Sequence, residues 1–400
     1  MTSENKTIIE AGAGYSNIEN SIEAATAAAK QAMDQAGITK ADWALVFCTF
    51  PHRANYQEIL KIVCLLTQTK NISGCSAIGV LSNQGEIEAQ PGIVVLAVSS
   101  KIIRAKPFVI YQLGAGGMKA GEEIGELLKS SKSPNSLLTL LPDPFHIHPE
   151  LLFKGIESKL GEVPIVGATA SEDPRINDTF EFYGDSVASG AVSGLLLDGE
   201  FSYKIDITQG CQLVGDPCVI TKANKNIISE LDGEPAFQVL KKRVPRGLLR
   251  DPMDIMRYLF VAFPPDPDQD DISGSDYLVR NLIGVDQKSG YVAVPQNVKE
   301  GQIVAFTLRN PEMAREDLKQ MLYRITSDQD PDHPFKFGIY FNCCARGSSL
   351  YGHQGIDTAY ITNVLGDIPF IGFFGNSEFA PLQNNNHLFT YTGVLVLFSE

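Results

Sequence analysis

The chain has 400 residues, with 33 basic and 47 acidic side chains and a formal net charge of −14 at pH 7. Hydrophobic residues make up 44% of the chain and charged residues 20%, so the chain can bury a substantial core. Binding to nucleic acid or to an anionic membrane surface needs clustered Lys and Arg, so the acidic balance argues against both kinds of partner. We therefore expect a protein that acts on small molecules or on other proteins.

Neither a membrane span nor a secretion signal is predicted. No apolar run reaches the roughly 18 residues that a bilayer-spanning helix needs, and the start of the chain has no basic segment followed by an apolar one. The seven cysteines are scattered, with one adjacent pair, Cys343-Cys344, and no CxxC spacing. This usage predicts reduced thiols in a cytoplasmic protein.

Three segments of the chain repeat one order of expected elements: a helix, an apolar strand, a second helix, a strand centred on glycine and a closing apolar strand. In the first segment these elements are expected at residues 21–36, 43–47, 57–67, 72–76 and 93–98. In the second segment they are expected at 117–130, 137–141, 149–160, 165–169 and 192–197. In the third segment they are expected at 311–326, 337–342, 358–365, 370–374 and 394–398. The central glycines, Gly74, Gly167 and Gly372, are each expected in a turn.

Extra length separates the second and third segments at about residues 201–309. Strands are expected there at 203–207, 218–221, 291–294 and 303–307, and helices at 235–242 and 253–263. The repeats predict an α/β (mixed α+β) fold, a layered helix/sheet architecture built from α-β-α-β-β units with mixed or mainly antiparallel pairing. Gly114 to Gly121 is interpreted as a loop-to-helix turn rather than a phosphate loop, and 264–271 as a solvated loop rather than a calcium site.

Several motifs resemble the FIST family. Phe341-Asn342-Cys343-Cys344-Ala345-Arg346-Gly347 is similar to the F-x-C-x-x-R-G segment of that family, and residues 372–381 resemble its G-F-F-x-x-G-E-I-G-P turn. Gly74-Cys75-Ser76 matches its G-C-S/T turn, and residues 231–236 resemble the D-G-x-P-A start of its second half. Ser377 and Phe379-Ala380 depart from the pattern, because the family has Gly and Ile-Gly there.

The resemblance implies an N-terminal FIST domain at residues 17–235, made of two repeated units, and a C-terminal FIST domain at 236–400 with motifs at 341–347 and 372–381. It implies a sensory protein of signal transduction that binds a small ligand, with amino acids proposed, and not an enzyme. With no output domain expected in the chain, the signal would pass to a separate protein partner. The alternative is a protein-interaction adaptor with a vestigial cavity, as in the F-box members of the family.

Arg346 and Glu378 are the central candidates for ligand binding. Arg346 follows a predicted strand and can bind a carboxylate through a two-point guanidinium contact. Glu378 lies in the turn after the neighbouring strand and can bind an ammonium group. Together they suit an amino acid or a similar small carboxylate, whereas in the alternative they pair only with each other and stabilise the fold. The other expected ligand-binding residues are Asn376, Cys343, Gly347, Gly74, Cys75, Ser76 and Thr169.

Two minor alternatives remain open from the sequence. Cys343 is either a thiol made reactive by Arg346 or a buried cysteine, and a Cys/Glu enzyme site with Glu378 is an alternative although no catalytic motif is present. No cofactor is expected, but His353 and His387 near the C-terminal motifs leave a haem-based gas sensor as a further alternative. His146-x-His148 lacks a third metal ligand. The sequence does not predict an oligomeric state.

Overall fold

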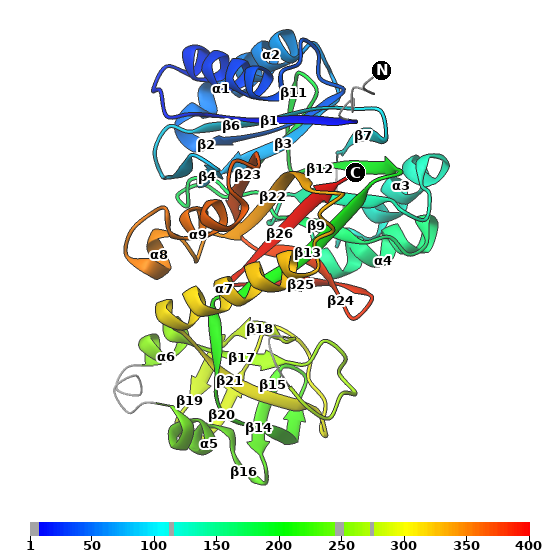
Figure 1. Ribbon diagram of the computed structural model, residues 1–400. Coiled ribbons are helices and arrows are strands. Elements are labelled where there is room, and N and C mark those ends of the chain that lie inside the picture. The colour runs from blue at the N-terminus through cyan, green and yellow to red at the C-terminus, as the bar shows by residue number, and fades with distance from the viewer. Residues whose placement is uncertain (1–7, 112–115, 245–251, 273–275) are drawn as a thin grey trace. The chain divides into compact units, whose positions relative to one another are not determined.

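The structure is a computed structural model that describes residues 8–111, 116–244, 252–272 and 276–400 (Figure 1). It is 27% helix and 42% strand, with several mixed sheets, which confirms the predicted α/β class. The chain forms two compact units. The main unit comprises Met1–Ile207, Leu318–Leu388 and Thr392–Glu400, and the insert unit comprises Thr208–Asp317 and Phe389–Tyr391.

The main unit holds most of the helices. These are α1 (Ser21–Ala36), α2 (Tyr56–Thr67), α3 (Met118–Leu128), α4 (Pro149–Leu160), α8 (Ser348–Tyr351) and α9 (Ile356–Leu365), with 3-10 turns η1 (Phe50–Asn55) and η2 (Lys129–Ser131). Helix α7 (Pro311–Ser327) begins in the insert unit and ends in the main unit. The predicted turn at Gly114 and Ala115 lies outside the described residues, and the helix after it begins at Met118.

Three six-stranded sheets with one common strand order make up the rest of the main unit. The first sheet has the order β1 (Ile9–Ser16), β6 (Ile93–Ser100), β2 (Trp43–Thr49), β3 (Ile72–Ala77), β10 (Phe180–Tyr183), β11 (Ser186–Ser189). The second sheet has the order β7 (Ile103–Ile110), β12 (Val192–Gly199), β8 (Leu137–Pro142), β9 (Ile165–Ala168), β24 (Glu378–Leu382), β25 (Asn385–Phe389). The third sheet has the order β13 (Ser202–Gln209), β26 (Thr392–Ser399), β22 (Phe335–Cys343), β23 (Phe370–Gly375), β4 (Gly79–Ser82), β5 (Gly85–Glu88).

Each sheet takes four strands from one repeat and a two-stranded hairpin from another. The first sheet receives the β10–β11 hairpin of the second repeat, the second sheet receives β24–β25 of the third, and the third sheet receives β4–β5 of the first. The exchange is therefore cyclic. Only one strand pair in each sheet is parallel among the pairings given: β2 with β3, β8 with β9, and β22 with β23. The repeat is longer than predicted, because a leading strand and the exchanged hairpin extend the α-β-α-β-β order.

The three repeat glycines lie inside strands, so the predicted turns at these positions are wrong. Gly74, Gly167 and Gly372 occupy β3, β9 and β23 and pair with the parallel neighbour at the same register position. A Cβ atom at any of them would overlap a backbone carbonyl oxygen, namely that of Val46, Leu140 or Tyr340. Close approach of two strands therefore requires glycine in all three repeats.

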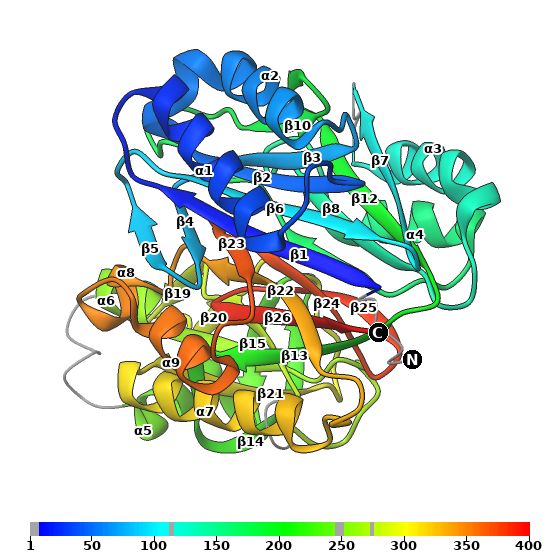
Figure 2. The ribbon, with the colours of Figure 1, turned by 45° about the horizontal axis from the view of Figure 1, so that its top comes forward.

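A helix pair covers one face of the first sheet and another covers one face of the second. In Figures 1 and 2, α1 and α2 lie side by side over the first sheet, and α3 and α4 lie side by side next to the second. Helix α1 begins where the Asn20 side chain accepts the N–H groups of Ile22 and Glu23, and it ends at Gly37 with φ 66°. Its alanines pack against Val46, Val95 and other residues of the sheet in one apolar core. The third sheet buries Tyr340, Phe370 and Leu395 against α7 and α9.

The insert unit is built on a fourth sheet and takes up most of the extra length that the sequence indicates at 201–309. Its strand order is β18 (Leu278–Asn281), β17 (Leu259–Phe263), β21 (Ile303–Arg309), β14 (Cys211–Asn224), β15 (Ile227–Leu231), β20 (Tyr291–Ala293), β19 (Gly284–Asp286), with β16 (Glu234–Pro235) paired to β15. Helices α5 (Ala236–Arg243) and α6 (Pro252–Tyr258) complete it. The predicted helix at 253–263 is wrong beyond Tyr258, because the buried run from Leu259 pairs with β21 and β18.

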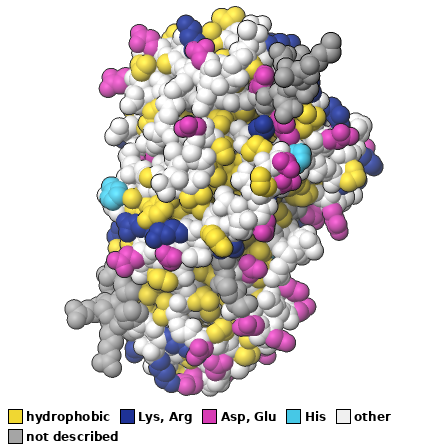
Figure 3. Space-filling model, in the orientation of Figure 1, with side chains coloured by type: hydrophobic (Ala, Val, Ile, Leu, Met, Phe, Trp, Pro, Cys, Tyr) yellow, Lys and Arg dark blue, Asp and Glu magenta, His cyan; other side chains and the backbone are white. Residues whose placement is uncertain are grey.

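The surface agrees with the acidic composition. Acidic side chains are scattered over the face drawn in Figure 3 rather than gathered at one place. Within the described residues, no helix is long and apolar enough to cross a lipid bilayer.

Candidate functional site

Arg346 is positioned by the turn that follows β22. Its backbone N–H donates to the Cys343 carbonyl at 2.8 Å, which closes this turn. The guanidinium forms a two-point ion pair with Asp357, with Nε to Oδ2 at 2.9 Å and Nη2 to Oδ1 at 3.1 Å. Nη2 also donates to the Tyr351 hydroxyl at 2.8 Å. The side chain is 0% exposed, and Nη1 has no hydrogen-bond partner among the described residues.

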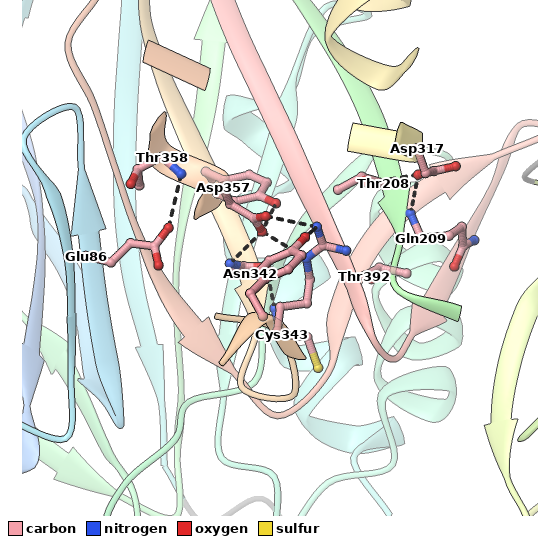
Figure 4. Close-up of polar contacts among 12 residues, drawn as sticks. Glu86, Thr208, Gln209, Asp317, Asn342, Cys343, Asp357, Thr358 and Thr392 are labelled. Atoms are coloured by element: carbon pink, nitrogen blue, oxygen red, sulfur yellow. Dashed lines mark hydrogen bonds and ion pairs between the residues drawn. The ribbon is translucent and has the colours of Figure 1, made fainter. Parts of the chain in front are cut away.

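Asp357, at the start of α9, gathers donors from β22 as well. Tyr340 donates its hydroxyl to Oδ2 at 3.0 Å, and Asn342 donates its amide at 3.1 Å (Figure 4). Against the opposing effect of burial, the Arg346 guanidinium lowers the pKa of Asp357. Burial opposes the charge of Arg346 too, yet Asp357 holds the pKa of Arg346 above its usual range. Both groups are therefore ionised and form a buried pair.

Two carboxylates of the β5 strand hold the chain that follows Arg346. Glu86 accepts the N–H groups of Gly355 at 2.8 Å and Thr358 at 3.0 Å, and so caps α9 (Figure 4). Glu88 accepts the Ser348 N–H at 2.9 Å and the Ser348 hydroxyl at 2.6 Å. Burial raises the pKa of Glu86 to about 7, and the Asp357 charge adds to the effect.

Gly347 contributes close packing rather than a polar group. Its φ is 56°, and a Cβ there would lie 2.6 Å from Glu88 Oε1. The glycine of the R-G motif therefore allows the carboxylate to reach the chain after Arg346.

Glu378 begins β24 and is also 0% exposed. Its Oε2 accepts the Thr392 hydroxyl at 2.8 Å and the Thr392 N–H at 3.3 Å. Burial raises the pKa of Glu378 well above its usual range, and the neighbouring Cys343 raises it further. Burial therefore favours the neutral carboxylic acid over the carboxylate. Its Oε1 is buried with no hydrogen-bond partner among the described residues.

The ion-pair partner of Arg346 is thus Asp357 and not Glu378. The sequence alternative in which Arg346 and Glu378 pair only with each other is wrong, because a charged residue of α9 occupies the guanidinium edge formed by Nε and Nη2. Asp357 was missed as a partner. It lies eleven residues beyond Arg346, in a segment that the sequence assigns to no element.

Three other predicted site residues lie at the same strand ends. The Thr169 N–H donates to the Ser377 carbonyl at 2.9 Å, and the Ser377 N–H donates to the Thr169 hydroxyl at 3.1 Å. Asn376 donates its side-chain amide to the Ala170 carbonyl at 3.3 Å. Cys343 is buried beside Glu378. Thr169, Asn376 and Cys343 therefore gather around Glu378.

Gly74, Cys75 and Ser76 lie in β3 of the first sheet, buried, and do not reach Glu378 directly. The Ser76 hydroxyl donates to the Ser171 carbonyl at 3.0 Å and accepts the Phe180 N–H at 3.1 Å. The Ser171 hydroxyl in turn donates to the Phe374 carbonyl. The N-terminal G-C-S segment is therefore linked to the end of β23 through one serine, rather than forming an exposed turn.

Glu181 is a buried carboxyl that the sequence did not single out. It stands opposite Cys75 on β3, as Glu378 stands opposite Ala168 on β9. It accepts the Thr179 hydroxyl at 2.9 Å and the Ala191 N–H at 3.2 Å. Burial raises the pKa of Glu181 well above its usual range. A Glu-Phe pair lies in the first strand of both hairpins, at Glu181-Phe182 and Glu378-Phe379, and an alignment of the repeats on that pair could have identified Glu181.

No metal centre is formed by the described part of the chain, since no three His, Cys, Asp or Glu residues there lie together in an arrangement that could hold an ion. His146 pairs instead with the buried Asp143. Of the two histidines named for the haem alternative, His353 is exposed and His387 is partly buried.

The chain matches the models of two protein-family domains, which together include the motifs described above. The FIST N domain matches residues 42–234 and the FIST C domain matches residues 236–381. The chain belongs to the FIST family, whose domains are associated with sensors of signal transduction. The predicted boundaries at 17–235 and 236–400 remain a prediction.

Relatives of similar length occur in mycobacteria. An uncharacterized protein of Mycobacterium tuberculosis is 28% identical over 391 residues, which cover 97% of this chain and 99% of the relative. One of Mycobacterium bovis is 26% identical over 390 residues, with 97% and 98% covered. An uncharacterized protein of Methanocaldococcus jannaschii is 23% identical over 299 residues, which cover 68% of this chain and 54% of the relative.

Among solved structures, cyanuric acid hydrolase from A. caulinodans matches with a TM-score of 0.28 and 12% identity. The match covers 48% of this chain and 72% of that structure. At this score the similarity supports no conclusion about fold or activity.

Proposed function

We propose that the protein is a cytoplasmic sensory protein of signal transduction that binds an amino acid or a similar small carboxylate and signals through a separate protein partner. Membership of the FIST family supports the sensory role. All seven cysteines are present as thiols, the form that a reducing cytoplasm maintains.

One observation carries the proposal: two ionisable side chains of the C-terminal motifs each keep a buried polar atom without a partner among the described residues. These atoms are Arg346 Nη1 and Glu378 Oε1. Leaving a buried polar group unsatisfied costs about 1–3 kcal/mol, and more when the group is charged. A small polar ligand that hydrogen-bonds to both atoms would remove that cost.

The ion pair with Asp357 and the burial of Glu378 restrict how such a ligand can bind. Because Asp357 occupies the edge of Arg346 formed by Nε and Nη2, a ligand carboxylate would meet Nη1 alone. An ammonium group would meet Glu378, which must first lose its proton to carry a charge. Binding of an amino acid here would therefore release a proton. Both side chains are buried, so the covering chain must move for the ligand to enter.

The contact between Cys343 and Glu378 does not favour the enzyme alternative. A general base must accept the thiol proton, and burial and Cys343 raise the pKa of Glu378, which favours the protonated carboxyl over a base. No contact among the described residues specifically favours the alternative of a protein-interaction adaptor.

Isothermal titration with each common amino acid tests the proposal, on the wild type and on Glu378→Gln. The glutamine keeps the shape and the neutral charge of the protonated carboxyl, so the fold should be preserved. We expect one amino acid to release heat, at least about tenfold weaker binding in Glu378→Gln, and an apparent enthalpy that changes with the ionisation enthalpy of the buffer. Absence of heat with every amino acid contradicts the proposal.

A further inference from the structure

A second group of ionisable and polar side chains, Glu172, Tyr56 and Arg53, lies near the ends of β2 and β3 in the first sheet. Glu172 follows β9 of the second sheet, and its Oε2 accepts the Tyr56 hydroxyl at 3.1 Å. All of these residues belong to the main unit. None of the comparisons assigns a role to Glu172 or Tyr56.

The Glu172 carboxyl is only half satisfied. Its other oxygen, Oε1, is buried with no hydrogen-bond partner among the described residues, and the residue is 7% exposed. Burial raises the pKa of Glu172, while hydrogen bonding to the carboxyl and the charge of Arg53 oppose this rise. A buried carboxyl oxygen without a partner suits a hydrogen-bond donor or a cation supplied by a ligand.

Arg53 lies beside this carboxyl and is exposed. Its guanidinium stacks over the Phe180 ring at 5.1 Å from the centroid, and its charge acts on both Glu172 and Asp173. In the described part of the chain Arg53 forms no ion pair. Arg175, on the loop after Glu172, instead donates to both carboxylate oxygens of Asp173. The guanidinium edge of Arg53 is thus available to an anion, unlike that of Arg346.

Aromatic rings complete the surroundings. Tyr56 packs against Phe180 and Phe182 with centroid distances of 5.6 and 5.1 Å. Aromatic faces next to a carboxylate favour an ammonium group, because the ring quadrupole attracts a cation.

We infer that this cluster is a second ligand site, which binds a small zwitterion with its ammonium group at Glu172 Oε1 and its carboxylate at Arg53. The inference stands on the unpartnered oxygen of Glu172, the available guanidinium of Arg53 and the aromatic rings between them. It does not depend on the site at Arg346 and Glu378. Of the two sites, this one holds an arginine without an ion pair among the described residues and a carboxyl with one unpartnered oxygen.

The test is titration of the full-length protein with each of the common amino acids, and with the amine and the N-acetyl derivative of any that binds. We compare the wild type with Glu172→Gln and Arg53→Gln. Arg175→Gln is the matched control, since that arginine lies near Arg53 but is paired with Asp173. Arg53 is exposed, so its replacement leaves the fold intact.

We expect binding of one amino acid to weaken at least about tenfold in Glu172→Gln and in Arg53→Gln, with Arg175→Gln unchanged. The amine, which lacks a carboxylate, should bind the wild type and Arg53→Gln equally. The N-acetyl derivative, which lacks the cation, should bind Glu172→Gln and the wild type equally. These matched comparisons hold even if one variant loses some stability.

Two results overturn the inference. The first is absence of amino-acid binding to the wild type. The second is binding that survives in Glu172→Gln and Arg53→Gln but is lost in Glu378→Gln, a pattern that would place the ligand at the C-terminal motifs and support the proposed function alone. Loss in the Glu172 and Arg53 variants with retention in Glu378→Gln supports the second site and contradicts binding at the C-terminal motifs.

Discussion

Glu181 and Glu378 occupy equivalent positions in two neighbouring sheets. Each stands opposite the residue that follows the repeat glycine, and each accepts the backbone N–H at the start of its closing segment, that of Ala191 or Thr392. Each side chain is 0% exposed. The repeat therefore preserves a buried carboxyl in two copies, while the third copy has an apolar residue, Val80, opposite Phe373.

Both carboxyls should be protonated at neutral pH, because burial raises the pKa of each well above its usual range. Infrared spectra at pH 7 should contain the carbonyl band of a protonated carboxyl. We expect Glu181→Gln and Glu378→Gln each to remove part of that band. A spectrum that both substitutions leave unchanged would show that these groups are ionised.

The helices of the repeats could be predicted closely from the sequence, because apolar periodicity and terminal signals lie within each helix. Residues 21–36 and 149–160 match α1 and α4 at both ends. The hairpins could not be predicted. β10–β11 pairs with β3, about a hundred residues earlier in the chain, and nothing local in these four-residue strands indicates such a distant partner.

Replacing one partner of the buried ion pair between Arg346 and Asp357 should lower the free energy of unfolding strongly. Replacing both partners should lower it by less than the sum of the two single replacements. Asp357→Asn leaves the guanidinium buried without a counter-charge, so we expect a loss of about 3–5 kcal/mol in the free energy of unfolding. The double variant Arg346→Met with Asp357→Asn should lose less than the sum of the single losses. Urea denaturation of all four proteins measures the coupling, and additive losses would contradict the pairing.

Stability should depend on pH through Glu86. Burial raises the pKa of Glu86 from 4.5 to about 7, so the folded state keeps the proton in a range where the unfolded state loses it. The stability that this group contributes is present below pH 4.5 and falls as the pH rises to about 7. The loss is on the order of 3 kcal/mol.

Glu86→Gln removes this titration. The difference in unfolding free energy between wild type and variant, measured from pH 4 to pH 8, should shift in favour of the variant with rising pH and then level off. Glu234, an exposed acid of the insert unit, provides the matched substitution Glu234→Gln, which should leave the profile unchanged. A parallel pair of curves for wild type and Glu86→Gln would contradict the assignment.

The repeat glycines should tolerate no side chain. Gly372→Ala places a methyl group against the Tyr340 carbonyl oxygen inside the sheet, so we expect a loss of about 2–3 kcal/mol. Gly37→Ala is the control: that position has φ 66° with open space around it and should lose about 1 kcal/mol. Thermal unfolding compares the two, and an equal loss would contradict the close-approach explanation.

The candidate site was only partly predictable. Arg346, Gly347 and Glu378 could be identified from the sequence, because each lies within one of the two short C-terminal motifs. The contacts that decide their chemistry come from elsewhere: Glu88 from the first repeat and Asp357 from α9. No spacing rule relates such residues, so the sequence could not reveal that one guanidinium edge is already occupied.

The two halves of the chain should not fold separately. The fragment 1–235 lacks the β24–β25 hairpin that completes its second sheet, and the fragment 236–400 lacks the β4–β5 hairpin that completes its sheet. We expect each fragment alone to be insoluble or non-cooperative in thermal unfolding, and the two co-expressed fragments to purify as one complex. A cooperative transition in either isolated fragment would contradict this expectation.

The cyclic exchange of hairpins also affects how such a chain can evolve. Two family domains that adjoin in sequence could be shuffled by recombination only if each carried its own complete sheets. Here a crossover between the domains would separate hairpins from the strands that they must match in register. We therefore expect the two domains to be inherited together, as in the mycobacterial relatives that align over 97% of this chain.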